Sequence, residues 1–569
     1  MARGLLTFVL ISALTAPTPA AQPIIRQPQL AANSSVLCNV DDVEPQRNMP
    51  KMQYSPSPVT VMGAPPPPAP PPPPSVAAPQ SQIVVSGSRM VAPMMRADED
   101  RERYKGERVA PVQAVANAPV STFAVDVDTG SYANVRRFLM EGRQPPAEAV
   151  RTEEMLNYFR YDYPRPEDRS RPFSVTTDVA RTPWNPATRL LRIGIRGYDV
   201  AREERPQANL VFLVDVSGSM QEPDKLPLVK AALTDLADQL NPRDRVSIVV
   251  YAGAAGLVLK PTNDKNAVKA ALACLEAGGS TAGGEGLMLA YKTARDAYIE
   301  GGINRVILCT DGDFNVGVSS DHGLTDLVKK QRDSGITLTT LGFGEGNYNE
   351  WMMEQIADVG NGNYGYVDSA MEARKLLGEE LSSTLFTIAK DVKVQVEFNP
   401  AVVSEYRLVG YENRALAEED FANDKVDAGD IGAGHQVTAI YELVPVGTKG
   451  WLPDRRYPAN RLDARTAGAT SEAAWLKLRY KLPGSESSKL IEQPVPAAAL
   501  ASAAPAQGDF AFATAVAAFG QKLRGDEYLG NYGWSDIRAL AGTDGDYWRQ
   551  EFGKLVGLAE SSRGSRSGE

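Results

Sequence analysis

The chain has 569 residues, a formal net charge of −10 at pH 7 and a sequence pI of about 5.2. This length is enough for roughly three domains of ordinary size. Because an acidic chain without a dense run of Lys and Arg is poorly suited to a phosphate backbone, we expect no nucleic-acid partner. The two histidines, His322 and His435, fall in different predicted domains, which disfavours a zinc site or a Ser-His-Asp triad.

Three cysteines, Cys38, Cys274 and Cys309, are too few for a disulfide framework. Cys309 lies in an apolar strand pattern and Cys274 in a helical one, so we interpret both as small buried hydrophobic residues. A bridge is the alternative, since a sequence does not show which cysteines come within reach of each other.

The N-terminal residues are typical of an export signal. Arg3 supplies positive charge, an apolar stretch follows from Leu5 to Leu14, and small residues stand at Ala20 and Ala21. The apolar stretch has about ten residues, half of the roughly twenty that span a bilayer. We therefore predict a cleaved signal peptide over residues 1–21 and no transmembrane helix in the mature chain.

Residues 22–115 are predicted to form a disordered, proline-rich spacer. The nearly uninterrupted prolines from Pro65 to Pro74 favour a polyproline II helix about 30 Å long. Within the spacer, Ile83–Arg89 resembles a segment near the N-terminus of TonB-dependent outer-membrane receptors. A chance match, a short adhesive strand and an envelope-docking motif are the three interpretations that we keep open.

The next region, residues 116–205, is predicted to contain strands and helices. The strands are Phe123–Val127, Phe173–Val179 and Leu190–Ile195, and the helices are Tyr132–Met140 and Glu153–Phe159. Before the first helix, Asp126, Asp128, Thr129 and Ser131 imitate a metal-binding string. No partner loops follow at a suitable spacing, so we interpret these residues as the cap of the helix.

Strands and helices alternate between residues 206 and 389. The predicted strands are Leu210–Val216, Arg245–Tyr251, Arg305–Thr310, Ile336–Gly342 and Tyr364–Val367. A helix is expected after each strand, and the last helix covers Ala370–Ile388. Buried strands that alternate with amphipathic helices predict an α/β domain with a doubly wound, mostly parallel, Rossmann-like sheet.

Beyond residue 390 the pattern returns to strands. Apolar residues occupy every second position in Val392–Phe398, Val437–Leu443 and Leu476–Leu482. We predict a β-rich domain over residues 390–494, and a β-sandwich-like region built from segments before and after the α/β domain. Val495–Ala506 is predicted to be a linker, and residues 507–560 a helical C-terminal segment whose aromatic residues pack within it.

Three loops are predicted to bring oxygen ligands to one edge of the parallel sheet. Asp215, Ser217 and Ser219 follow the first strand, Thr281 lies in a glycine-rich loop, and Asp311 follows the Arg305–Thr310 strand. Open α/β sheets bind ligands at the carboxyl ends of their strands. Two carboxylates and three hydroxyls suit Mg²⁺, with Mn²⁺ or Ca²⁺ as alternatives.

This pattern resembles the metal-ion-dependent adhesion site (MIDAS) of von Willebrand factor type A (VWA) domains. The resemblance implies that Ser217, Ser219 and Thr281 touch the metal, and that Asp215 and Asp311 act directly or through water. Two carboxylates balance a divalent charge and leave one coordination position for an Asp or Glu of a partner protein. We therefore expect a binding or adhesion module without catalytic residues.

The flanks resemble the bacterial YfbK-type proteins, through Ser121–Arg136, the turn Thr182–Pro186 and the C-terminal β-plus-helix region. Such proteins combine an N-terminal companion region, which corresponds to residues 116–205 here, with a VWA domain and a C-terminal domain of uncharacterised function. The resemblance implies an exported protein of the periplasm or cell envelope of a Gram-negative bacterium, associated with the cell wall or outer membrane. Many members look like lipoproteins, from which this sequence departs because Cys38 lies too far along the chain.

Two other functions are kept as alternatives. A Mg²⁺-dependent envelope hydrolase would need a general base, for which Asp313 and Glu285 are the nearby candidates. A structural scaffold of the envelope would hold the metal only incidentally.

Overall fold

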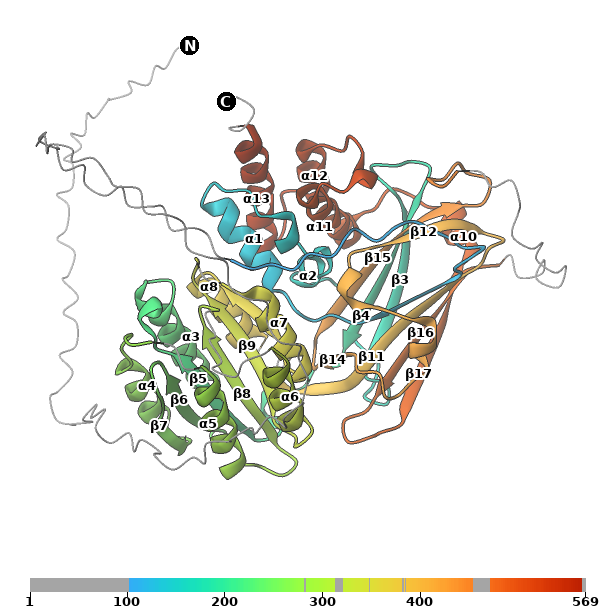
Figure 1. Ribbon diagram of the computed structural model, residues 1–569. Helices are drawn as coiled ribbons and strands as arrows, with labels where there is room; N and C mark the ends of the chain where they lie inside the picture. The colour runs from blue at the N-terminus through green and yellow to red at the C-terminus, as the bar shows by residue number, and fades with distance from the viewer. Residues whose placement is uncertain are drawn as a thin grey trace, which may run out of the picture. The chain divides into compact units, whose positions relative to one another are not determined.

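Figure 1 shows the computed structural model of the chain. It describes residues 102–280, 283–312, 321–346, 348–380, 383, 385–453 and 471–564. The predicted signal peptide and most of the predicted spacer, including Ile83–Arg89, lie outside these residues. Within them, no helix is both long and apolar enough to cross a bilayer.

The α/β domain is built on a six-stranded sheet. In spatial order its strands are β10 (Tyr364–Val367), β9 (Thr337–Phe343), β8 (Ile303–Thr310), β5 (Ala208–Asp215), β6 (Arg245–Tyr251) and β7 (Ala255–Thr262). All neighbours are parallel except β7, which runs antiparallel to β6. The strand order reverses at β5, which pairs with both β6 and β8, and this switch point is where doubly wound sheets bind ligands.

Helices cover both faces of this sheet (Figure 1). They are α3 (Leu226–Gln239), α4 (Lys265–Ala273), α5 (Gly283–Asp296), α6 (Asp321–Arg332), α7 (Glu350–Val359) and α8 (Ala370–Arg374). Phe212 of β5 packs with α3, α4 and α8 in one core, and Leu213 of the same strand packs with α5, α6 and α7 in another. The predicted doubly wound fold is thereby confirmed.

The end of this domain differs from the prediction of one helix over Ala370–Ile388. After α8 the chain makes one π-helical turn, Lys375–Glu379, and strand β11 already begins at Thr387. The β-branched residues Thr387 and Ile388 belong to the strand because β11 gains antiparallel partners in three neighbouring strands.

The remaining strands form two facing antiparallel sheets. The first sheet is ordered β1 (Gln113–Ala114), β12 (Val403–Val409), β15 (Gln436–Pro445), β4 (Arg189–Gly197) and β3 (Phe173–Arg181). The second is ordered β13 (Ala415–Leu416), β2 (Val120–Ala124), β11 (Thr387–Phe398), β16 (Glu472–Lys481) and β17 (Ser488–Pro496), with β14 (Gly429–Gly432) also on β11. Phe123, Ile193, Val394 and Tyr441 from both sheets share one core. Strands from before and after the α/β domain mix in each sheet, as predicted.

A further core lies among helices from the two ends of the described chain. These helices are α1 (Gly130–Met140), α2 (Thr152–Asn157), α11 (Gly508–Arg524), α12 (Trp534–Ala541) and α13 (Tyr547–Gly564). Tyr132, Leu156, Phe519, Trp534 and Phe552 pack together in this core. The helical C-terminal end is confirmed. The predicted linker, however, contains helix α10 (Ala497–Ala501), because Leu500 is buried in the sandwich core.

Ordered structure also begins before the predicted boundary at residue 115. The Glu102 carboxylate, 2% exposed, lies 2.8 Å from the guanidinium of Arg137. Strand β1 pairs with β12, and Val115 is 1% exposed. Residues 102–115 therefore belong to the folded part of the chain, because Glu102, strand β1 and Val115 make contacts there.

The two cysteines of the α/β domain differ from each other. Cys309 on β8 is a buried free thiol, as predicted, and burial raises its pKa. Cys274 is half-buried at the end of α4 and is disulfide-bonded. The interpretation of Cys274 as a buried hydrophobic residue is therefore wrong, because this residue after the last turn of α4 is only half-buried and its sulfur forms a disulfide.

Candidate metal-ion site at the edge of the parallel sheet

Asp215, the last residue of β5, is fully buried and held by three hydrogen bonds. Its Oδ1 accepts from the backbone N–H of Ser217 at 2.9 Å. Its Oδ2 accepts from the hydroxyls of Tyr251 and Thr310, each at 3.0 Å. Burial raises the pKa of Asp215 and the nearby Asp311 carboxylate acts in the same direction, whereas the hydrogen bonds from Ser217 and Tyr251 lower it. The carboxylate is thus fixed in direction by the ends of three neighbouring strands.

The two predicted serine ligands lie in the loop after β5. The Oγ atoms of Ser217 and Ser219 are 3.0 Å apart. The same loop is tied to the glycine-rich loop, because Gly218 N donates to Gly279 O at 3.1 Å and Gly278 N donates to Val216 O at 2.7 Å. Thr281, two residues beyond this contact, lies outside the described residues.

Asp311 directly follows β8 and is fully buried. Strand β8 pairs in parallel with β5, so the carboxyl ends of the two strands place Asp311 beside the Asp215 loop. Oδ2 of Asp311 accepts from Nζ of Lys225 at 3.0 Å. The structure therefore brings together four of the five predicted ligands, and adds a lysine to them.

The described donor set consists of two carboxylates and two hydroxyls. In the described part of the chain, no three His, Cys, Asp or Glu side chains are grouped so as to hold a metal. A cation at this edge would therefore depend on the hydroxyls and on ligands beyond the two carboxylates. Hard oxygen donors of this kind, half of them neutral, fit Mg²⁺ or Mn²⁺, which keep several waters and accept an incomplete protein cage.

Three side chains of the site were not predicted. Tyr251 ends β6 in register with Asp215, and Thr310 directly precedes Asp311, so their positions at strand ends are a signal that could have identified them. Lys225 carries no such signal, because it is 86 residues from Asp311 and meets it only through packing.

The residues considered for other chemistry lie elsewhere or outside the described residues. Glu285 is exposed on α5, and Asp313 is outside the described part. His435 lies between β14 and β15, where burial lowers its pKa to about 4. We find no geometric support for assigning catalysis to Glu285 or His435.

The string before α1 has a different role from the predicted one. The Thr129 side chain makes no capping hydrogen bond, so the interpretation of this string as a helix cap is wrong. Asp128 instead accepts from the backbone N–H of Tyr364 at 2.8 Å and lies 3.2 Å from Arg414. Its carboxylate is used to join the companion region to strand β10, and not to its own helix.

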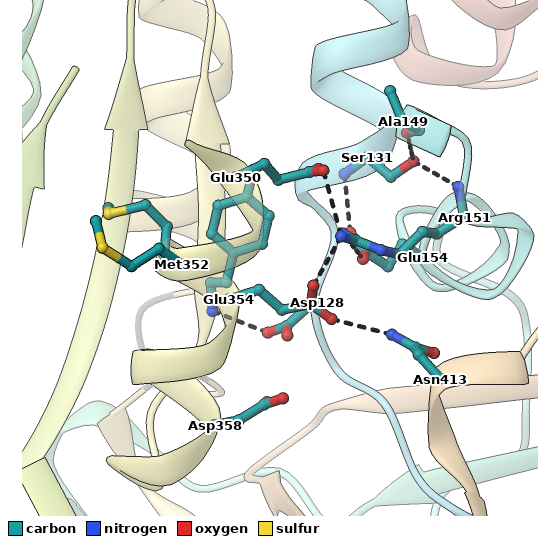
Figure 2. Close-up of polar contacts among 12 residues, drawn as sticks. Asp128, Ser131, Ala149, Arg151, Glu154, Glu350, Met352, Glu354, Asp358 and Asn413 are labelled. Carbon is teal, nitrogen blue, oxygen red and sulfur yellow. Dashed lines mark hydrogen bonds and ion pairs between the residues drawn. The ribbon is translucent and has the colours of Figure 1, made fainter. Parts of the chain in front are cut away.

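Charged side chains fill the neighbouring contact between α2 and α7 (Figure 2). Arg151 lies 2.8 Å from Glu154, 3.2 Å from Glu350 and 2.7 Å from Glu354. Ser131 contributes by accepting from the backbone N–H of Arg151 at 2.9 Å. The α/β domain is therefore joined to the companion region by buried contacts between Arg151 and glutamate side chains.

Family models match three parts of the chain. They are described as von Willebrand factor (residues 98–192), von Willebrand factor type A domain (residues 209–379) and Uncharacterized protein YfbK, C-terminal (residues 383–561). The chain is 48% identical over 471 residues to the uncharacterized protein YfbK of Escherichia coli K12, covering 80% of this chain and 81% of that protein.

Two solved structures are also similar to parts of the chain. The conserved hypothetical protein BatB from Bacteroides thetaiotaomicron is 26% identical, with 31% of this chain and 97% of that chain covered and a TM-score of 0.28. A von Willebrand factor type A protein from Catenulispora acidiphila is 16% identical, with 72% and 89% covered and a TM-score of 0.37.

Proposed function

Because this chain belongs to the YfbK family and carries a von Willebrand factor type A domain, we propose that it is a binding module and not an enzyme. In this proposal a MIDAS holds Mg²⁺ and captures an acidic residue of a partner protein in the periplasm or cell envelope. The observation that carries it is the meeting of Asp215 and Asp311 with the hydroxyls of Ser217 and Ser219.

The proposed ligands are Asp215, Ser217, Ser219 and Asp311, completed by Thr281 from the glycine-rich loop. A divalent cation bound there would supply the positive charge that attracts a carboxylate. The chain's own residues orient the ligands: Tyr251 and Thr310 hold Asp215, and the hydrogen bonds between the two loops hold the serines.

The engagement of the site carboxylates favours binding over hydrolysis. A hydrolase would need a carboxylate or imidazole that can take a proton from water. Both oxygens of Asp215 accept hydrogen bonds, and Asp311 is paired with Lys225. Because these donors already engage both carboxylates, neither is placed to take a proton from water, which favours an adhesion site over a hydrolase.

The proposal is tested by capture of envelope proteins on the immobilised full chain. Three conditions are compared: Mg²⁺, EDTA, and Mg²⁺ with the Asp215→Ala variant. Asp238→Ala serves as the matched control, because Asp238 is an exposed acid of α3 that pairs only with a surface lysine in the described contacts. Melting curves of all variants establish that each is folded.

We expect one set of proteins to be retained with Mg²⁺ by the wild type and by Asp238→Ala, and to be lost with EDTA and with Asp215→Ala. Retention of the same proteins under all conditions would contradict the proposal and favour a structural scaffold. Release of a cleaved envelope component in a Mg²⁺-dependent reaction would instead favour the hydrolase.

A further inference from the structure

Lys225 places an ammonium group against one of the two site carboxylates. Its Nζ lies 3.0 Å from Oδ2 of Asp311, and the two side chains are 8% and 0% exposed. Lys225 directly precedes α3, in the segment that follows the Ser217–Ser219 loop. The chain itself thus supplies one positive charge to this pair of carboxylates.

The side chain of Lys225 is seated against the backbone of Gly344, the first residue after β9. A Cβ at position 344 would overlap Cγ and Cε of Lys225, and Gly344 has φ +68°, which also favours glycine. The Gly344 carbonyl accepts from the Tyr366 hydroxyl at 2.7 Å, so this backbone is held in place. Lys225 is therefore a packed part of the site and not a surface lysine that passes by it.

An ammonium group in this position has two electrostatic effects. It repels a divalent cation held by Asp215 and Asp311, and it attracts an anion that approaches that cation. Asp215, Asp311 and Lys225 together carry a net charge of −1, because two carboxylates face one ammonium group. A divalent cation would turn this excess into a single positive charge, which one partner carboxylate would neutralise.

We propose that Lys225 makes cation binding at this site depend on an acidic ligand. By its charge it lowers the affinity of the site for a divalent cation alone, and raises the affinity of the loaded site for a carboxylate. The inference rests on the proposed function and adds to it a coupling between the two ligands, which is reciprocal by thermodynamic linkage. The chain would then hold its metal firmly only together with an acidic partner.

The test measures Mn²⁺ binding to the full chain by electron paramagnetic resonance. Lys225→Met removes the charge and keeps an unbranched apolar stem beside Gly344. Lys269→Met is the matched control, because Lys269 is a partly exposed lysine of α4 that pairs with Asp238. Each protein is titrated in sodium chloride and in sodium acetate of equal ionic strength, so that acetate serves as the carboxylate probe.

We expect Lys225→Met to bind Mn²⁺ in chloride about tenfold more tightly than the wild type, since it lacks one nearby positive charge. Acetate should tighten Mn²⁺ binding to the wild type and to Lys269→Met, and have a much smaller effect on Lys225→Met. A second readout is the melting temperature. Without added metal Lys225→Met should melt below the wild type, because Asp311 loses its ammonium partner, and Mn²⁺ should raise its melting temperature by more.

The outcomes separate this inference from the proposed function. Equal Mn²⁺ affinity and equal acetate dependence in the wild type and Lys225→Met, with binding lost in Asp215→Ala, would overturn the role of Lys225 and leave the proposed function standing. Absence of Mn²⁺ binding in both proteins would overturn both proposals. Binding that is detected only in Lys225→Met would support the inference, because the lysine would then control access of the cation.

Discussion

The guanidinium of Arg136 donates to both carboxylate oxygens of Asp368, from Nε to Oδ2 at 2.6 Å and from Nη2 to Oδ1 at 2.5 Å. Arg136 belongs to α1, whereas Asp368 directly follows β10 of the α/β domain. The same guanidinium lies 2.7 Å from Glu372 on α8 and 3.0 Å from Glu551 on α13. One buried cation therefore joins the companion region, the α/β domain and the C-terminal helix.

Replacing Arg136 by Met is expected to lower the free energy of unfolding by about 3–5 kcal/mol, because three buried carboxylates would lose their cation. Urea unfolding followed by tryptophan fluorescence measures this, with the first transition compared between proteins. The control is Arg143→Met, since the Arg143 side chain is 41% exposed in its pair with Glu141. The control should change stability by less than about 1 kcal/mol. Equal losses in the two variants would contradict the prediction.

Substitution of Gly130 tests the close approach of α1 to the α/β domain. A Cβ at Gly130 would overlap the ring of Tyr364 on β10, so Gly130→Ala should destabilise the chain by about 1–3 kcal/mol. At Gly553 in α13, nothing lies within 4 Å of the added Cβ. Gly553→Ala should therefore stabilise the helix by about 0.5–1 kcal/mol. Melting temperatures that move in the same direction in both variants would refute this account.

The buried acids around Arg151 predict that stability falls as the pH rises (Figure 2). Burial raises the pKa of Glu154 and of Glu350 to about 8, although Arg151 lowers both. An unfolded chain titrates its glutamates near pH 4.3. Between about pH 4.3 and about pH 8 the folded state thus holds more protons than the unfolded state, and the free energy of unfolding decreases with rising pH.

Melting temperatures measured across this window should therefore decline toward pH 8. In Glu350→Gln the decline should be shallower, because the amide cannot ionise in the buried contact. Glu397→Gln is a suitable control, as Glu397 lies in an exposed pair with Lys477 and should leave the slope unchanged. A slope in Glu350→Gln identical to that of the wild type would show that Glu350 does not titrate in this window.

Excision of the α/β domain provides a further test. Residues 206–389 alone would lose the arginines that face Asp368, Glu350 and Asp358 from outside the domain. Because these contacts are buried in the chain, we expect the excised domain to melt at a lower temperature than residues 102–564. In the excised domain these three carboxylates would lose their arginine partners, and contacts with water would not fully replace the lost stabilisation. An equal melting temperature for the two proteins would show that the flanks do not stabilise the domain.

The sequence predicted an element correctly where the pattern of apolar residues within one short segment shows which of its faces are buried. Continuous apolar residues in β5 identified a strand buried on both faces, and alternation in Val392–Phe398 identified a strand with one buried face. The spacing of Asp215, Ser217 and Ser219 within one loop predicted the candidate site, because all three residues follow the same strand end.

The sequence did not predict every strand, and it did not predict the partners of buried charged side chains. Strand β7 escaped prediction because it lies at the edge of its sheet and its residues are mostly half-exposed. The edge strand β17 was missed as well, and so was β12, which is mostly buried between β1 and β15. The role of Asp128 was misinterpreted because its partners, Tyr364 and Arg414, come from distant parts of the chain.

By itself, then, the sequence determined the class of fold and most of the strands and helices of the α/β domain, and it predicted the oxygen ligands of the candidate site. Only the tertiary structure decided that Lys225 pairs with Asp311, 86 residues away, and that Arg136 pairs with Asp368, 232 residues away. The physical reason is that hydrophobic periodicity is a local property, set by which face of an element is buried. A buried charge gains its partner only when separate elements pack, so its partner cannot be inferred from its neighbours in the sequence.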